Sequence, residues 1–425
     1  VHMTHVLLGQ DPAAATRLYA ALLGHFLPDM WTPMVEGALL QARMVGGGEA
    51  ALVAAAGTDK KTRAALADFR TALADAGAAA AGGHPGAALE FAAAARYAAT
   101  VAYARSQKGR EGELRAVWIH DSFGVADWGW ERSMEVLAEA GFNAIIPNML
   151  DAGQASYPSA WLPPHPRVAE EGDQMAQLLA AAHRHGIEVH AWKVNYNLNT
   201  APPEFVERMR QEGRLQANTA GVEMPWLCPS HPENRRLEAE SMLEVVRNYD
   251  VDGIHFDYIR YPGSEGCYDD GCRTRFQAQT GHIVREWPRD VLTGPLTEPF
   301  QKWRQAQITA LVRDVAVRSR DIRAEVQISA AVFSQWDQSR YTVGQDWVLW
   351  AQEGYLDFVC PMNYIPNVEQ FEATVRRQVD WIDGSIPLYS GIGAWQMSSV
   401  EDILAEVEAT RRLGADGFVM FEYSA

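Results

Sequence analysis

The chain has 425 residues, of which 48% are hydrophobic and 21% charged, and its formal net charge is −17. This composition excludes a disordered chain, and the negative charge argues against nucleic acid or an anionic membrane surface as a partner. The sequence has no run of about eighteen apolar residues, so it contains no candidate transmembrane helix.

The first three residues, Val-His-Met, are interpreted as a remnant of an expression vector. A secretory signal could therefore have preceded them, and we expect an exported protein, either periplasmic or extracellular. The sequence does not indicate an oligomeric state.

Residues 1–112 are rich in alanine and poor in β-branched residues, which is typical of helices. Glycine-containing breaks at 46–48 and 81–86 divide this region into about three predicted helices. It has no paired carboxylates, histidine clusters or phosphate loops, so we expect a structural or docking role. Its large aromatic residues are expected to pack in a core: Phe26, Trp31, Phe91, Tyr97 and Tyr103.

From Arg115 onward, short apolar runs alternate with amphipathic segments of helical length. Strands are predicted at 115–120, 143–148, 188–194, 253–259, 327–333, 358–363, 386–392 and 417–422. Helices are predicted at 130–140, 171–185, 233–249, 300–319, 345–352, 368–383 and 399–413. Eight alternations predict an α/β fold, a (β/α)8 TIM barrel over 113–425 preceded by the helical region 1–112, because doubly wound sheets usually stop at five or six strands.

Motifs for cofactors are missing from this pattern. No GxGxxG follows the first strand and no GxxxxGK[ST] occurs, so a nucleotide cofactor is not predicted. Cys267 and Cys272 lie close together in a Gly- and Asp-rich loop, where they form either a local disulfide or two free thiols. Because Cys228 and Cys360 provide no second CxxC pair, no metal site is predicted.

The functional residues of such a barrel lie at the C-terminal ends of its strands. In this chain those positions are rich in Trp, Tyr, Asn, Asp and His, which stack on sugar rings and hydrogen-bond to hydroxyls. Cations there are nearly limited to Lys193 and Arg260, too few for a phosphate substrate. A carbohydrate substrate is therefore predicted, with these binding residues: Asp121, His120, Trp192, Asn195, His255, Tyr258, Arg260, Asn363, Tyr364 and Trp395.

Asp257 is the strongest catalytic candidate because it ends a strongly apolar strand, where an unpaired carboxylate is costly. The alternative is a purely structural ion pair with Arg260. His255 has the same strand parity as Asp257 and is expected to face the cleft as a hydroxyl donor. Asp252, at the opposite end of the strand, is expected to be structural.

Glycoside hydrolysis ordinarily needs two carboxyl groups, one protonated and one ionised. We predict Asp257 as nucleophile or base, with Glu422, or failing that Asp337, as the acid. Glu422 lies between Phe421 and Tyr423, where desolvation would raise its pKa. Asp121 and Asp151 are weaker candidates. This chemistry requires no cofactor.

The segments WLCPSHP (226–232) and YDVDGIHFDYIRYP (249–262) resemble the signature of glycosyl-hydrolase-like family 10. Further similar segments lie at 115–118, 140–144, 157–159, 190–192, 345–347 and 355–364. The resemblance implies a bacterial, often exported TIM-barrel glycosidase acting on a polysaccharide or oligosaccharide. Tyr258 stands where family members often carry a second acidic residue. The alternatives are a non-catalytic glycan-binding barrel and an enzyme that transfers the glycosyl group to another sugar.

Overall fold

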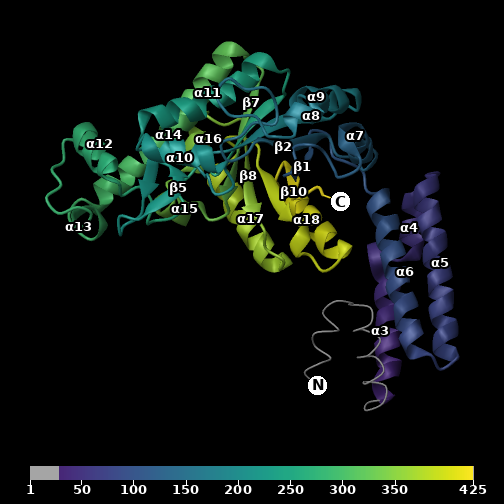
Figure 1. Cartoon of the computed structure of the whole chain (residues 1–425). Helices are drawn as coiled ribbons and strands as arrows, with labels where there is room; N and C mark the ends of the chain where they lie inside the picture. Colours follow the sequence, from purple (N-terminus) through teal and green to yellow (C-terminus); the bar gives the residue numbers. More distant parts are fainter. Residues whose placement is uncertain (1–27, 425) are drawn as a thin grey trace, which may run out of the picture. The chain divides into compact units, whose positions relative to one another are not determined.

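The computed structural model describes residues 28–424 (Figure 1). They divide into two compact units. One ends at Arg110 and also takes in Ser399–Leu404, and the other contains Glu111–Ser398 and the residues from Ala405 onward. No helix in this range is long and apolar enough to cross a membrane.

The first unit is helical, as predicted. Its described elements are η1 (Pro28–Met30), α3 (Trp31–Met44), η2 (Val45–Gly47), α4 (Glu49–Ala56), α5 (Lys60–Ala81) and α6 (Pro85–Ser106). Both predicted glycine breaks are confirmed. Gly46 adopts φ +60°, and a Cβ there would lie 2.7 Å from the Leu52 and Tyr103 side chains, so the sharp turn requires glycine.

The core of this unit is built mainly from small side chains. Ala95, Ala99 and Ala102 of α6 are fully buried, which lets the helices approach closely. The prediction that the aromatic residues pack inside is wrong for Phe91 and Tyr97, whose side chains are exposed. Tyr103 does pack against the core, Trp31 is half-buried, and Phe26 lies outside the described residues.

The second unit is a closed barrel of eight parallel strands, which confirms the predicted fold. Around the barrel the strand order is β1-β10-β9-β8-β7-β6-β3-β2. The strands are β1 (Leu114–Ile119), β2 (Ala144–Leu150), β3 (Glu188–Val194), β6 (Gly253–Asp257), β7 (Gln327–Phe333), β8 (Phe358–Asn363), β9 (Tyr389–Gly393) and β10 (Gly417–Phe421). Each overlaps a strand predicted from the sequence.

The predicted barrel helices are also present. They are α7 (Gly129–Glu139), α9 (Gln174–Arg184), α11 (Pro232–Asn248), α14 (Thr297–Ile322), α16 (Trp347–Gln352), α17 (Val368–Ile382) and α18 (Val400–Leu413). Short elements in the connections were not predicted: α8 (Val168–Glu171), α10 (Pro203–Gln211), α12 (Asp270–Thr280), α13 (Arg289–Leu292), α15 (Trp336–Thr342), η3 (Ala394–Gln396) and the antiparallel hairpin of β4 (Leu215–Ala217) and β5 (Glu223–Leu227).

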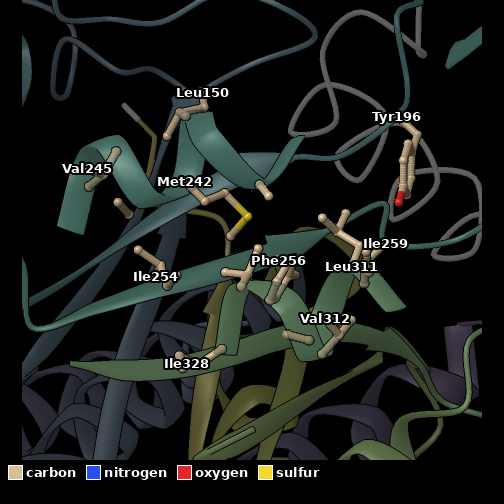
Figure 2. Close-up of a cluster of buried hydrophobic side chains, with 14 of the residues drawn as sticks. Leu150, Tyr196, Met242, Val245, Ile254, Phe256, Ile259, Leu311, Val312 and Ile328 are labelled. Carbon is tan, nitrogen blue, oxygen red and sulfur yellow. The ribbon is translucent and has the colours of Figure 1, made fainter. Parts of the chain in front are cut away.

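Strand β6 shows how the core orients the functional residues. Figure 2 shows Ile254 and Phe256 among Met242 of α11 and Leu311 and Val312 of α14, all in one buried cluster. Because side chains alternate along a strand, His255 and Asp257 point the other way, into the barrel. The hydrophobic layer between strand and helices thereby fixes the direction of the Asp257 side chain.

Candidate active site

A cavity of about 210 Å³ lies at the C-terminal mouth of the barrel. Asp257, Phe333 and Phe421 line it, and each is the last residue of its strand. The complete lining is Trp118, His120, Trp192, Asp257, Tyr258, Arg260, Ala331, Phe333, Met362, Tyr364 and Phe421. Among these residues Asp257 is the only carboxylate.

The Asp257 carboxyl is held by the chain around it. The Asn195 backbone N–H donates to the Asp257 carbonyl oxygen (2.8 Å), and the Tyr258 backbone N–H donates to Asp257 Oδ1 (2.6 Å). Tyr258 adopts a left-handed backbone with φ +52°, which turns the chain directly after the strand. The position of the carboxyl is therefore fixed by backbone contacts.

Only 7% of Asp257 is exposed, although it lines the cavity. Burial raises the pKa of Asp257 to about 6, and this rise is opposed by the Tyr258 N–H and by the nearby Arg260 and His120. Both protonation states are therefore populated near pH 6. A carboxyl poised in this way suits proton transfer.

Aromatic rings form most of the cavity wall. The rings of His120 and Trp192 lie 4.9 Å apart, and those of Tyr364 and Phe421 lie 5.3 Å apart. Trp118 is fixed because its indole N–H donates to His255 Nε2 (3.1 Å). Rings with a few polar groups between them provide the stacking faces and hydrogen bonds that a sugar needs.

Arg260 is occupied by other contacts. Its Nη1 donates to the Tyr261 carbonyl oxygen (3.1 Å), and its guanidinium carbon lies 4.5 Å from the centre of the Phe333 ring. Within the described residues, Arg260 makes no direct ion pair with Asp257. The contact on which the structural alternative for Asp257 depends is therefore absent there.

Glu422 follows β10 directly, beside the cavity. Its Oε2 lies 2.6 Å from Nδ1 of His120, a residue that lines the cavity, and 29% of the Glu422 side chain is exposed. Burial, together with the charges of Asp257 and Glu422, raises the pKa of Tyr364 well above its usual value. Tyr364 therefore lies within electrostatic range of both carboxyl groups.

A second pocket of about 190 Å³ adjoins the first and shares His120 with it. Its other lining residues are Asp121, Ser122, Phe123, Asn148, Asp151, Gln154, Ser156, His165 and Arg167. Asp121 accepts a hydrogen bond from the Phe123 backbone N–H (2.9 Å), and the Arg167 guanidinium lies 3.8 Å from the centre of the Phe123 ring. This pocket is polar where the first is aromatic.

Several predicted binding residues lie elsewhere. Asn195 is buried and donates to Glu238 Oε2 (2.7 Å), and Asn363 is buried and bonded to Gln378 and Ser390. His255 is buried beneath Trp118, and its Nδ1 lies 2.8 Å from Ser329 Oγ. The His255 side chain points into the barrel, as strand parity requires, but it lies below the cavity rather than lining it. Asn195 and Asn363 have the opposite parity to the cavity-lining Trp192 and Met362, and they point outward to Glu238 of α11 and Gln378 of α17.

Three other expectations also differ from the structure. Trp395 is 63% exposed and lies outside the cavity lining. Asp337 is exposed in the first turn of α15 and lines neither pocket. Lys193, expected at the rim, is buried and pairs with Glu238 (3.6 Å). Asp252 accepts a hydrogen bond from the Val189 backbone N–H (2.8 Å), in keeping with a structural role.

Some lining residues were missed by sequence reasoning. Trp118, Phe333, Met362 and Phe421 line the cavity, and His165 and Arg167 line the polar pocket. Strand parity could have found Trp118, because it lies two residues before His120 on the same face of its strand. No such signal exists for His165 and Arg167, which lie in a long connection.

Comparisons with known proteins identify the family of the barrel. The glycosyl hydrolase-like 10 family model matches residues 113–403. The chain is 23% identical to the glycosyl hydrolase YngK of Bacillus subtilis over 61% of this chain and 55% of that protein. It is 24% identical to the glycosyl hydrolase DigH of Escherichia coli over 64% of this chain and 66% of that protein.

A third relative, an S-layer-related protein of Niallia circulans, is 24% identical over 53% of this chain and 16% of its own length. The chain therefore spans only part of each of these relatives. Among solved structures, the glycoside hydrolase domain of PgaB (BpsB) from Bordetella bronchiseptica matches with a TM-score of 0.57 and 16% identity, covering 73% of this chain and 94% of that one. At this level of identity, the likeness shows the fold alone.

Proposed function

The chain belongs to the glycosyl hydrolase-like 10 family, and from this premise we propose that it cleaves glycosidic bonds of a polysaccharide or oligosaccharide at the Asp257 cavity. The family and the glycosyl hydrolase relatives support a glycoside hydrolase-type function. The observation that carries the finer proposal is a carboxyl with a raised pKa in an aromatic cavity at the barrel mouth.

In this proposal Asp257 is the proton donor. The sequence favoured it as nucleophile or base, but a pKa raised to about 6 by burial favours the protonated form that assists a leaving oxygen. The Tyr258 N–H bonds Asp257 Oδ1, which leaves Oδ2 as the oxygen proposed to carry the proton toward the sugar.

Glu422 is proposed as the ionised partner, acting as nucleophile or as base toward a water molecule. Water reaches its partly exposed side chain, and the contact with His120 Nδ1 holds one of its oxygens in place. His120 then acts as a positioning residue between the two carboxyl groups, because it lines the cavity and contacts Glu422.

The two adjoining pockets support a substrate of more than one sugar unit. Rings in the Asp257 cavity can stack on the sugar whose bond is cleaved, while Asp121, Asp151 and Arg167 can hydrogen-bond the hydroxyls of a neighbouring unit. A chain-like carbohydrate also fits the proposal of export, which the S-layer-related relative supports.

The first experiment is a screen of the purified protein against bacterial and plant polysaccharides, with product analysis by mass spectrometry. Asp257→Asn is the matched control, since asparagine keeps the oxygen that accepts from Tyr258. We expect shortened products with the unchanged chain alone. Binding of a polysaccharide without any cleavage would instead identify a glycan-binding barrel.

A second experiment assigns the two carboxyl roles, using the aryl glycoside of the sugar that the screen identifies. A nitrophenyl leaving group needs no protonation, so Asp257→Ala should still cleave the glycosidic bond of this substrate at nearly the unchanged rate, measured as the first release of nitrophenol, while losing turnover on the polysaccharide. Glu422→Ala should lose both, and azide should restore turnover with a glycosyl azide as product. The reverse pattern would return Asp257 to the role of nucleophile or base.

A further inference from the structure

Three cysteines and an aspartate converge outside the Asp257 cavity. Cys228 follows β5, whereas Cys267, Asp269 and Cys272 lie in the connection after β6 and the first turn of α12. One ligand atom from each of the four residues lies within 4.8 Å of all the others. In the structure Cys267 and Cys272 form a disulfide, and Cys228 is a free thiol.

The third cysteine lies equally close to both members of the bridge. Cys228 Sγ is 3.4 Å from Cys267 Sγ and 3.3 Å from Cys272 Sγ. All three sulphur atoms are buried. Asp269 completes the group, because its Oδ2 lies 2.9 Å from Cys272 Sγ. A simple local disulfide requires neither a third sulphur nor a carboxylate.

The two Cys228 separations, 3.4 and 3.3 Å, lie close to those of a tetrahedral metal site, and opening of the Cys267–Cys272 bridge frees its two sulphurs to move apart to a similar spacing. Zinc bonds of about 2.3 Å to sulphur and about 2.0–2.2 Å to oxygen place neighbouring ligand atoms roughly 3.4–3.8 Å apart. Thiolates favour zinc over magnesium or calcium. Four protein ligands leave no open position, which is typical of a structural rather than a catalytic zinc site.

The surrounding residues supply orientation and charge. The Cys272 backbone N–H donates to Asp269 Oδ1 (2.8 Å), which turns Oδ2 toward the sulphurs. Arg275 Nη2 lies 3.3 Å from both Cys228 Sγ and Asp269 Oδ1, and Arg275 Nε donates to Ser230 Oγ (2.9 Å). Three thiolates and a carboxylate around Zn²⁺ carry a net charge of −2, which the arginine partly offsets.

We propose that Cys228, Cys267, Cys272 and Asp269 form a structural zinc site when the cysteines are reduced. A dithiol or phosphine reductant supplies two electrons, and two protons from solvent complete the conversion of the bridge to two thiols. Zn²⁺ then displaces the protons of three thiols and binds the ionised Asp269. This proposal is independent of the glycosidase assignment.

Such a zinc ion would brace the segment that follows the catalytic candidate. The loop from Tyr258 to Cys267 starts at the Asp257 cavity and ends at the cluster. The next residue, Tyr268, already contacts the β4–β5 hairpin, because its backbone N–H donates to the Ala217 carbonyl oxygen (2.8 Å). Zinc would tie this loop to the end of β5 through Cys228.

The test starts with the full chain reduced by a phosphine, freed of reductant without oxygen and titrated with zinc sulfate. We expect one zinc per chain by mass spectrometry of the metal. Cobalt chloride in place of zinc should give the thiolate charge-transfer band and the visible bands of a tetrahedral site. A reduced chain that takes up less than about a tenth of an equivalent of zinc would overturn the proposal.

Variants then locate the metal. Cys228→Ser should weaken zinc binding by at least about 100-fold, more than the loss of an outer partner usually does. Cys360→Ser is the matched control, since Cys360 is buried in β8 outside the cluster, and it should bind zinc normally. Equal binding by both variants would contradict the assignment. If Cys228→Ser does not fold, the location of the metal is decided by the zinc affinity of Asp269→Asn, which should be lowered, and by the cobalt spectrum of the unchanged chain.

Counting free thiols after denaturation without reductant distinguishes the disulfide-bridged chain from the zinc-loaded chain. The bridged chain should show two free thiols, Cys228 and Cys360, whereas zinc-loaded chain denatured with a chelator should show all four. The contrary result is a reduced and reoxidised chain that binds no zinc and in which peptide mapping finds bridges from Cys228 to Cys267 or Cys272. That result would identify thiol–disulfide exchange instead of a zinc site.

Discussion

The two pockets at the barrel mouth share His120 and no other lining residue. The Asp257 cavity is walled by rings and holds a buried carboxyl, whereas its neighbour is lined by hydroxyl, amide, carboxylate and guanidinium groups. Desolvation in the first raises the pKa of Asp257. In the second, Asp121 is bonded to a backbone N–H and its side chain is half-exposed.

The difference teaches that position at the strand ends alone does not make a carboxylate reactive. Asp121 lies two residues after β1 and Asp257 ends β6, yet of these two only Asp257 is enclosed by apolar rings that disfavour its charge. We therefore propose that bond cleavage takes place in the aromatic cavity and that the polar pocket contributes to substrate recognition. Substitutions in the two pockets should separate these roles.

The largest effect is expected for Asp257→Asn. Hydrolysis of the polysaccharide found by screening should fall at least about 10³-fold, because the proton donor is lost. Steady-state product release measures it, and circular dichroism should show an unchanged fold. Turnover equal to that of the unchanged chain would remove Asp257 from the mechanism.

Glu422→Gln should reduce turnover by about 10²–10³-fold, since glutamine keeps the contact with His120 but cannot act as base or nucleophile. Asp337→Asn is the matched control, because Asp337 is exposed and lines neither pocket. It should leave kcat unchanged. A large loss in Asp337→Asn with none in Glu422→Gln would restore the second choice made from the sequence.

The pH dependence should follow Asp257. As a proton donor with a pKa of about 6, it should make kcat/KM fall about tenfold per pH unit above that value. The free energy of unfolding should change over the same pH range. The folded chain binds the Asp257 proton more tightly than the unfolded chain does, so protonated Asp257 stabilises the fold at low pH. This stabilisation is lost as the pH rises through about 6.

Melting temperatures test the stability part. Asp257→Asn should gain thermal stability relative to the unchanged chain at pH 7, and this gain should disappear at pH 4. A difference that does not vary with pH would show that the Asp257 carboxyl has an ordinary pKa.

Trp192→Phe should raise KM by roughly 3- to 10-fold, because a smaller ring stacks less well on a sugar. Trp395→Phe is the matched control, since Trp395 is exposed outside the cavity. Equal effects of the two substitutions on KM would show that sugar binding extends to Trp395, as the sequence suggested.

An effect of similar size, but limited to longer substrates, is expected in the polar pocket. Arg167→Ala should raise KM by roughly 3- to 10-fold for longer oligosaccharides, the value of about one hydrogen bond, and leave the shortest substrate unaffected. Arg132→Ala, an exposed arginine on α7 paired with Glu135, controls for loss of charge. An effect of Arg167→Ala on kcat alone would place the polar pocket in catalysis.

The alternation of short apolar runs with amphipathic segments was enough to predict all eight barrel strands. A short apolar run indicates a buried strand, and an amphipathic segment of helical length indicates a helix with one buried face. Strand ends likewise indicated His120, Trp192, Tyr258, Arg260 and Tyr364 around Asp257, and all of them line its cavity. Strand parity could not predict depth, since His255 points inward as expected but is buried beneath Trp118. For Asn363 the parity itself excludes the cavity, because its side chain faces Gln378 of α17.

Long-range convergence was the second gap. The spacing of Cys267 and Cys272 indicated a local pair, but nothing in the sequence placed Cys228, 39 residues before Cys267, beside them. The β4–β5 hairpin brings it there, and that hairpin is too short for periodicity to reveal. Arg167 reaches the polar pocket by a similar route, through a connection without a regular pattern.

The hydrogen bond between Trp118 and His255 has a consequence for enzymology. Burial lowers the pKa of His255 well below its ordinary value, so this imidazole stays neutral while it accepts from the indole and contacts Ser329. The base of the cavity therefore keeps one charge state and one shape across mildly acidic and neutral buffers. An ionisation seen in kinetic profiles near neutral pH should therefore not come from His255, which simplifies the titration of the groups that line the cavity.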